Sequence, residues 1–157
     1  MTINQNLVTR LRRVLPDILR DTPVKLAYLY GSVATGEALP TSDVDIGLVL
    51  WYSPPNEDFA MQPKERLHLE FAVEEALERQ GIFKADVRVI DDLPLTFRGE
   101  VVTHGIRLYS RDETARVEFE TRTWREYLDF QPVARMMRQA FFDDVRAHGL
   151  SRRRDRG

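Results

Sequence analysis

Two aspartates separated by one residue, Asp43 and Asp45, are the clearest chemical signal in the sequence. They open a run of apolar residues that predicts a strand over residues 43–51. Along a strand, residues i and i+2 point to the same face about 6.5–7 Å apart, so both carboxylates project to one side. Carboxylates at that spacing repel each other unless a cation lies between them. An oxygen-rich site of this kind suits Mg²⁺, which takes substrate phosphates as its remaining ligands.

A glycine–serine pair, Gly31 and Ser32, supplies the second half of such a site. It leaves the end of another apolar run, VKLAYLY, which predicts a buried strand. Glycine lets a phosphate approach the backbone, and Ser32 can donate both its N–H and its hydroxyl to phosphate oxygens near a helix start. Ten residues, Val33 to Ser42, separate this pair from Asp43.

A third acid, Asp86, lies in the run ADVRVI, where Val87 and Val89 alternate toward a core. The alternation places Asp86 on the opposite face of its strand, where it could meet Asp43 and Asp45 across the sheet. Three carboxylates on a sheet can hold two divalent ions about 3.5–4 Å apart, the arrangement used for in-line phosphoryl or nucleotidyl displacement. The sequence therefore predicts a two-metal site.

The glycine–serine pair, the ten-residue spacer and the paired aspartates resemble the signature of the DNA-polymerase-β-like nucleotidyltransferases, in their minimal (MNT) branch. Later segments look like the further landmarks of MntA-type antitoxins, and the resemblance extends from about Leu26 to Phe130. Those segments are residues 85–91, Leu93-Pro94, residues 105–109 and residues 127–130.

The resemblance implies an antitoxin that transfers AMP from ATP to a tyrosine of a HEPN-domain ribonuclease toxin and forms a hetero-oligomer with it. Asp43 and Asp45 would then bind one or both Mg²⁺ ions. Asp86 would complete the second metal site and help to deprotonate the attacking hydroxyl, and Gly31 and Ser32 would hold the outgoing phosphates.

The periodicity of apolar residues predicts one mixed α/β (α+β) sheet of about four strands with helices packed on it, in the order αβαβαβαβα. Pro16 is expected to bend or restart the first helix, and Pro132 is expected to break the last. The predicted helices cover residues 4–20, 31–36, 63–80, 95–103 and 112–148, and the predicted strands cover residues 24–30, 43–51, 83–90 and 106–109.

Length and composition exclude several classes of protein. The 157 residues, 43% apolar and 31% charged, predict a single globular domain over residues 1–150, with C-terminal helices from about 112 and a basic, disordered tail over residues 151–157. The chain has no cysteine and no secretory signal, and its longest apolar run is far too short for a membrane span, so a cytoplasmic protein is expected. A net charge of −2 argues against general nucleic-acid binding.

Two other functions remain open from the sequence alone. One is the modification of a small molecule, as in aminoglycoside nucleotidyltransferases. The other is an antitoxin that blocks its partner by binding, without catalysis. Large apolar residues in the C-terminal helices, among them Met136, Met137, Phe141 and Phe142, indicate either core packing or a docking surface for a partner.

Overall fold

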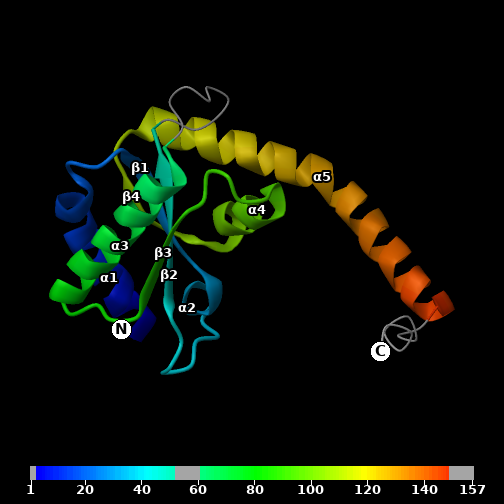
Figure 1. Ribbon diagram of the computed structural model, residues 1–157, viewed down its shortest axis with the longest axis horizontal. Coiled ribbons are helices and arrows are strands. Elements are labelled where there is room, and N and C mark those ends of the chain that lie inside the picture. Colours follow the sequence, from blue (N-terminus) through cyan, green and yellow to red (C-terminus); the bar gives the residue numbers. More distant parts are fainter. Residues whose placement is uncertain (1–2, 52–60, 149–157) are drawn as a thin grey trace. The chain divides into compact units, whose positions relative to one another are not determined.

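The computed structural model describes residues 3–51 and 61–148. Its elements alternate as the sequence predicted, and Figure 1 labels them along the chain. No helix within these two ranges is both long and apolar enough to cross a membrane. In chain order the elements are α1 (Ile3–Leu19), β1 (Val24–Tyr30), α2 (Gly31–Thr35), β2 (Val44–Leu50), α3 (Pro63–Arg79), β3 (Ala85–Val89), α4 (Leu95–His104), β4 (Ile106–Ser110) and α5 (Glu113–His148).

The four strands form one mixed sheet in the order β3-β2-β1-β4. β1 pairs antiparallel with both β2 and β4, whereas β2 and β3 run parallel. The predicted fold class, a mixed four-stranded sheet flanked by helices, is confirmed. Because β2 lies between β1 and β3, the ends of three strands that carry the predicted site residues are neighbours.

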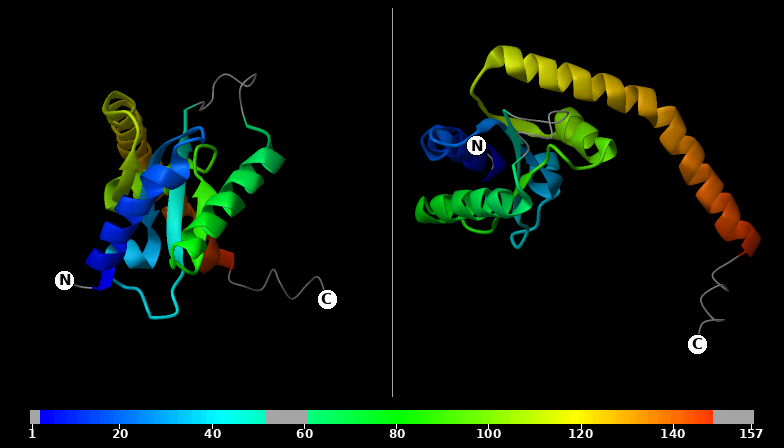
Figure 2. Two further views of the ribbon diagram at one scale, coloured as in Figure 1. Left: turned by 90° about the vertical axis from the view of Figure 1, so that its left-hand side faces the viewer. Right: turned by 45° about the horizontal axis from the view of Figure 1, so that its top comes forward.

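Each face of the sheet packs against its own helices. On one face, leucines and valines of the strands pack against buried residues of α1 and α3, such as Leu15 and Leu77. On the other face, Leu26, Tyr28 and Val49 pack against α4 and the first turns of α5. Figures 1 and 2 show this layering of helices on the sheet. The alternation of side chains along each strand is what divides the residues between the two faces.

Both prolines that were expected to interrupt helices lie inside continuous helices. Pro16 and Pro132 are exposed, so water can bind the carbonyl that each proline leaves without its helical hydrogen bond. In α1, the buried residues Leu11, Leu15 and Leu19 hold the helix on the sheet on both sides of Pro16. The predicted restart at Pro16 and the predicted break near Pro132 are therefore wrong.

The chain divides into two compact units, and α5 contributes to both. The first unit ends at Trp124 and contains the sheet, whereas the second begins at Arg125. The single domain predicted over residues 1–150 stays a prediction, and the predicted basic tail lies outside the described residues. In the second unit the described residues belong to α5.

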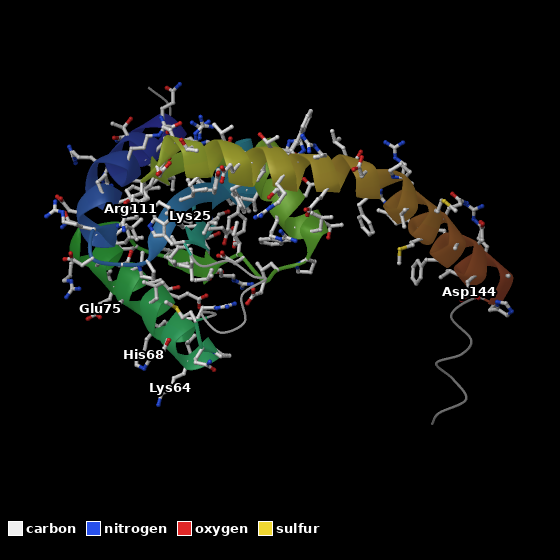
Figure 3. The ribbon with its side chains drawn as sticks, turned by 90° about the horizontal axis from the view of Figure 1, so that it is seen from above. Lys25, Lys64, His68, Glu75, Arg111 and Asp144 are labelled. Atoms are coloured by element: carbon white, nitrogen blue, oxygen red, sulfur yellow. The ribbon has the colours of Figure 1, made fainter. Side chains whose placement is uncertain are left out.

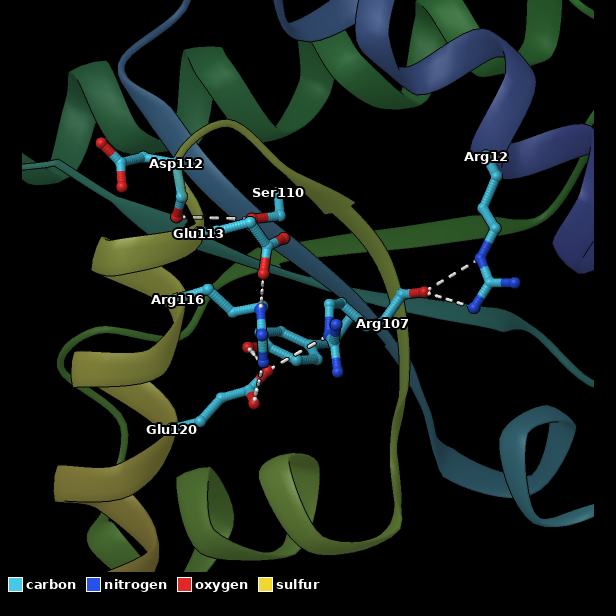
Figure 4. A network of polar contacts seen from close by, with 8 residues as sticks. Arg12, Arg107, Ser110, Asp112, Glu113, Arg116 and Glu120 are labelled. Atoms are coloured by element: carbon cyan, nitrogen blue, oxygen red, sulfur yellow. Dashed lines mark hydrogen bonds and ion pairs between the residues drawn. The ribbon is translucent and has the colours of Figure 1, made fainter.

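Side chains from helices occupy the outer edges of the sheet. On β3, the backbone N–H groups of Val87 and Val89 donate to the carboxylates of Glu74 and Glu70 on α3, both at 2.9 Å. On β4, the guanidinium of Arg12 donates to the carbonyl of Arg107 at 2.8 and 3.1 Å, as Figure 4 shows. Two N–H groups of β3 and one carbonyl of β4 that a further strand could bind are thus already hydrogen-bonded.

The N-terminal turns of α5 are tied to the sheet by a polar network around Glu120 (Figure 4). Its carboxylate accepts hydrogen bonds from the Tyr28 hydroxyl at 2.8 Å and from Arg116 at 2.9 Å, and it pairs with Arg107 at 3.3 Å. Burial and the bond to Glu120 raise the pKa of Tyr28. The network therefore fixes where α5 begins on the sheet.

Arg111 joins the end of β4 to the end of α1. Its guanidinium donates to the carbonyls of Leu19, Arg20 and Thr22, which lie at the last residue of the helix or just after it. In Figure 3 Arg111 is labelled in this region, while Lys64, His68 and Glu75 lie on the exposed side of α3.

Candidate active site

Asp45 lies at the centre of the predicted site. In the sheet register it stands opposite Tyr30 of β1 and opposite Asp86 of β3. Residues paired in this way project to the same face, so the carboxylates of Asp45 and Asp86 are neighbours. Val44 and Val87 are buried on the other face. The structure thus brings together two of the three predicted acids from strands that are about forty residues apart in the sequence.

Asp43 lies one residue before the start of β2 and is exposed. Its charge nevertheless acts on Asp45. Burial raises the pKa of Asp45 above its ordinary value, and the carboxylates of Asp86 and Asp43 raise it further. Like charges disfavour the ionised form of a carboxylate, so this shift reflects the charges of Asp86 and Asp43 acting on Asp45. Asp43 and Asp86 thus both act on Asp45, and these three residues are called the acidic cluster below.

Gly31 stands directly against this cluster. It has a φ of 75°, a left-handed conformation that glycine adopts without strain. A Cβ atom at this position would collide with Oδ2 of Asp45. The glycine is therefore required twice, once for the turn from β1 into α2 and once for the close approach of the backbone to the carboxylate.

Ser32 lies in the first turn of α2 and is half-buried. Its carbonyl accepts hydrogen bonds from the backbone N–H groups of Gly36 and Glu37, which closes the turn. The Ser32 hydroxyl makes no hydrogen bond within the described residues, so it is free to bind a ligand. The predicted phosphate-binding pair thus adjoins the acidic cluster, and its role stays a prediction.

A cavity of about 270 Å³ adjoins the Gly31 turn on the same side of the sheet. Tyr30 and Phe97 form part of its wall, and the centroids of their rings lie 5.2 Å apart in an edge-to-face contact. Burial and the nearby carboxylate of Asp45 raise the pKa of Tyr30 to about 12, so its hydroxyl stays protonated at neutral pH. The cavity is lined by Tyr30, Gly31, Thr35, Phe97, Glu100, Val101, His104 and Gly105.

Apart from Gly31, these wall residues were not predicted as site residues from the sequence. The alternation along β1 places Tyr30 on the same face as Tyr28, and it could have assigned Tyr30 to the site. Phe97 and His104 come from α4, whose placement over that face depends on tertiary packing, so no local pattern marks them.

The acidic cluster has the donor chemistry of a Mg²⁺ site, because carboxylate oxygens are the ligands that this ion prefers. The mutual repulsion that raises the pKa of Asp45 is what a divalent cation would relieve. Within the described residues, however, no group of three or more acidic or histidine side chains is arranged to hold a metal ion. Asp86 instead pairs with Arg88 at 3.4 Å. Metal binding by Asp43, Asp45 and Asp86 therefore stays a prediction.

The raised pKa of Asp45 predicts how pH acts on the metal-free protein. A carboxyl group whose pKa is higher in the folded than in the unfolded state destabilises the fold when ionised, and the loss disappears as pH falls through the folded-state pKa. We therefore expect Asp45→Asn to be more stable than wild type at about pH 7 in EDTA, and this advantage to shrink at about pH 4.

Urea denaturation at the two pH values measures this difference. Asp21→Asn, which removes an exposed charge in the turn after α1, is the control and should show no such gain. Equal stability of Asp45→Asn and wild type at both pH values would contradict the inferred repulsion.

The chain has clear similarities to known proteins. The sequence profile of the family described as "Polymerase beta, Nucleotidyltransferase" matches residues 15–114. No curated protein sequence matches this chain.

Solved structures of toxin–antitoxin proteins share the fold. A toxin–antitoxin structure with AMP-PNP matches with a TM-score of 0.61 and 24% identity, covering 85% of this chain and 97% of that one. A tri-AMPylated Shewanella oneidensis HEPN toxin in complex with MNT antitoxin matches with a TM-score of 0.59 and 22% identity, over 88% and 98% of the two chains. A MntA-HepT toxin–antitoxin structure matches with a TM-score of 0.58 and 22% identity, over 87% and 97%.

Proposed function

The chain belongs to the polymerase beta nucleotidyltransferase family, and from this premise we propose that it is an antitoxin that transfers AMP from ATP to a tyrosine hydroxyl of a HEPN ribonuclease toxin. Membership of the family makes the chain a nucleotidyltransferase. The observation that carries the proposal is the close approach of Gly31 to Asp45, because it places the turn predicted to bind phosphates beside the acidic cluster.

In the proposed reaction, the acceptor oxygen attacks the α-phosphorus of ATP, the bond to the β-phosphate breaks, and pyrophosphate leaves. Gly31 and Ser32 hold the departing phosphates, and Asp86 accepts the proton of the attacking hydroxyl. Mg²⁺ held by Asp43, Asp45 and Asp86 would supply positive charge for the phosphates. The protein contributes by positioning groups and balancing charge, without a covalent intermediate on the enzyme.

Two observations favour a protein as the acceptor. The acidic cluster is open, since Asp43 is exposed and the Asp86 side chain is 37% exposed, so a tyrosine on another macromolecule can reach it. The second unit also exposes large apolar side chains, among them Met136 at 72% and Phe141 at 64%. Exposed methionines and aromatic residues are typical of surfaces that bind a protein partner.

Intact-mass spectrometry of the product of the neighbouring gene, after incubation with this protein, ATP and Mg²⁺, tests the proposal. A gain of one or more AMP units that requires ATP supports it. A stable complex without a mass change would instead favour an antitoxin that acts by binding. Neither complex nor mass change, together with protection of a host against an aminoglycoside, would favour the modification of a small molecule.

The apolar side chains of the second unit give a separate prediction about the complex. Replacing both Met137 and Phe141 by glutamine is expected to weaken binding of the toxin at least about tenfold, because these exposed groups would lie at the centre of the interface. Binding of ATP should not change. Calorimetric titration of the toxin measures the effect, and Arg135→Gln, an exposed polar change on the same helix, is the control. An unchanged affinity would place the interface elsewhere.

A further inference from the structure

Arg88 lies beside the acidic cluster and has no role in the proposed chemistry. It follows Asp86 by two residues on β3, so both side chains project from the same face of the strand, while Val87 and Val89 are buried on the other. In the register of the sheet, Arg88 stands opposite Gly47 of β2, over which the side chains of Ile90 and Tyr30 lie.

The guanidinium of Arg88 binds both carboxylate oxygens of Asp86. Nε donates to Oδ1 and Nη2 donates to Oδ2, each at 3.4 Å. The charge of Arg88 also acts on Asp45 and on Tyr30, whose pKa values it lowers against the effect of the carboxylates. Arg88 is therefore the counter-ion of the cluster as a whole, and its main partner is Asp86.

One guanidinium leaves the cluster undercompensated, because three carboxylates carry more negative charge than it can balance. The contacts to Asp86 are long for a charge-assisted pair, and the side chain of Arg88 is 56% exposed. A long, exposed side chain held by such contacts can rotate away at low cost. A guanidinium cannot lose its proton in a protein, so it can only give way by moving.

We propose that Arg88 is a positioning residue that occupies Asp86 in the metal-free protein and competes with the divalent cation for that carboxylate. This inference depends on the proposed function, because it assumes that Asp86 is a metal ligand. Because the guanidinium must leave Asp86 before a cation can bind there, Arg88 sets the metal concentration at which the site fills. Binding of the cation releases the guanidinium from Asp86 into solvent.

Titration of the nucleotide-free protein with Mn²⁺, with free Mn²⁺ followed by electron paramagnetic resonance, tests this competition. Arg88→Gln is expected to bind Mn²⁺ about fivefold more tightly than wild type. This gain in affinity corresponds to the free energy of a partly exposed ion pair, here Arg88 with Asp86, which the metal no longer has to break. Arg88→Lys keeps the charge and should remain near wild type. Arg13→Gln removes an exposed arginine from α1, which covers the opposite face, and controls for the change in net charge.

Thermal unfolding supplies a second readout that a role in catalysis alone would not move. The ion pair between Arg88 and Asp86 stabilises only the metal-free protein, so its loss should both tighten Mn²⁺ binding and destabilise the metal-free fold. Arg88→Gln should therefore have a lower Tm than wild type in EDTA, and the difference should disappear in saturating Mn²⁺. Equal or weaker Mn²⁺ binding by Arg88→Gln would overturn the competition and leave the proposed function standing. Absence of Mn²⁺ binding in every variant would overturn both the competition and the metal site of the proposed function.

Discussion

Replacing Asp43 and Asp45 together by asparagine is expected to lower the rate of the proposed AMP transfer at least about a thousandfold. Asparagine keeps the size of the side chain but removes the charge that would hold a cation against the phosphates. Both positions belong to the cluster whose charges act on one another, so the loss should not be compensated by the remaining acid. Single-turnover transfer of AMP to the toxin, followed by intact mass, measures the rate.

The double variant also separates catalysis from binding. Its affinity for the toxin should equal that of wild type, since neither side chain contributes to the core. Asp21→Asn serves as the control for loss of an acidic charge outside the cluster and should transfer AMP at the normal rate. Full neutralisation of the toxin by the double variant would mean that the antitoxin acts by binding.

Gly31→Ala is expected to abolish most activity for a different reason. The added Cβ would displace the carboxylate of Asp45, and misplacement of a catalytic group by about 1 Å costs about a hundredfold in rate. The left-handed φ of 75° adds a loss of about 1–2 kcal/mol in the free energy of unfolding.

Gly36 offers a matched control for this substitution. It ends α2 with a φ of 81°, but a Cβ there would meet no atom within 4 Å. Gly36→Ala should therefore lose about the same stability as Gly31→Ala while keeping its AMP transfer activity. Chemical denaturation and the transfer assay, run on both variants, distinguish strain from displacement. Equal loss of activity in Gly31→Ala and Gly36→Ala would mean that the contact between Gly31 and Asp45 does not contribute to catalysis.

The order of elements and the face on which Asp86 lies could be predicted from the sequence, because both follow from local periodicity. Val87 and Val89 must be buried, so Asp86 must face the other way. The contact of Gly31 with Asp45 could not be predicted in this manner. It requires the antiparallel register in which Tyr30 stands opposite Asp45, and register across two strands is set by packing over the whole sheet.

The continuity of α1 at Pro16 could not be predicted from the local sequence either. A proline signals a helix end only when nothing else holds the helix, and the buried leucines of α1 outweigh the local preference at Pro16.

Arg88 looks like an ordinary exposed residue of an alternating strand. Its contact with Asp86 depends on a side-chain conformation that no sequence pattern specifies.

The occupied edges of the sheet restrict how a partner can approach. Glu70 and Glu74 already bind the outward N–H groups of β3, and Arg12 binds a carbonyl of β4, so recognition by β-augmentation would first have to break these bonds. A toxin that forms a complex with this protein is therefore expected to bind through side-chain surfaces. We expect its acceptor tyrosine to approach the acidic cluster on the side where Asp43 and Asp86 are exposed, which makes the shape of the toxin around that tyrosine a determinant of specificity.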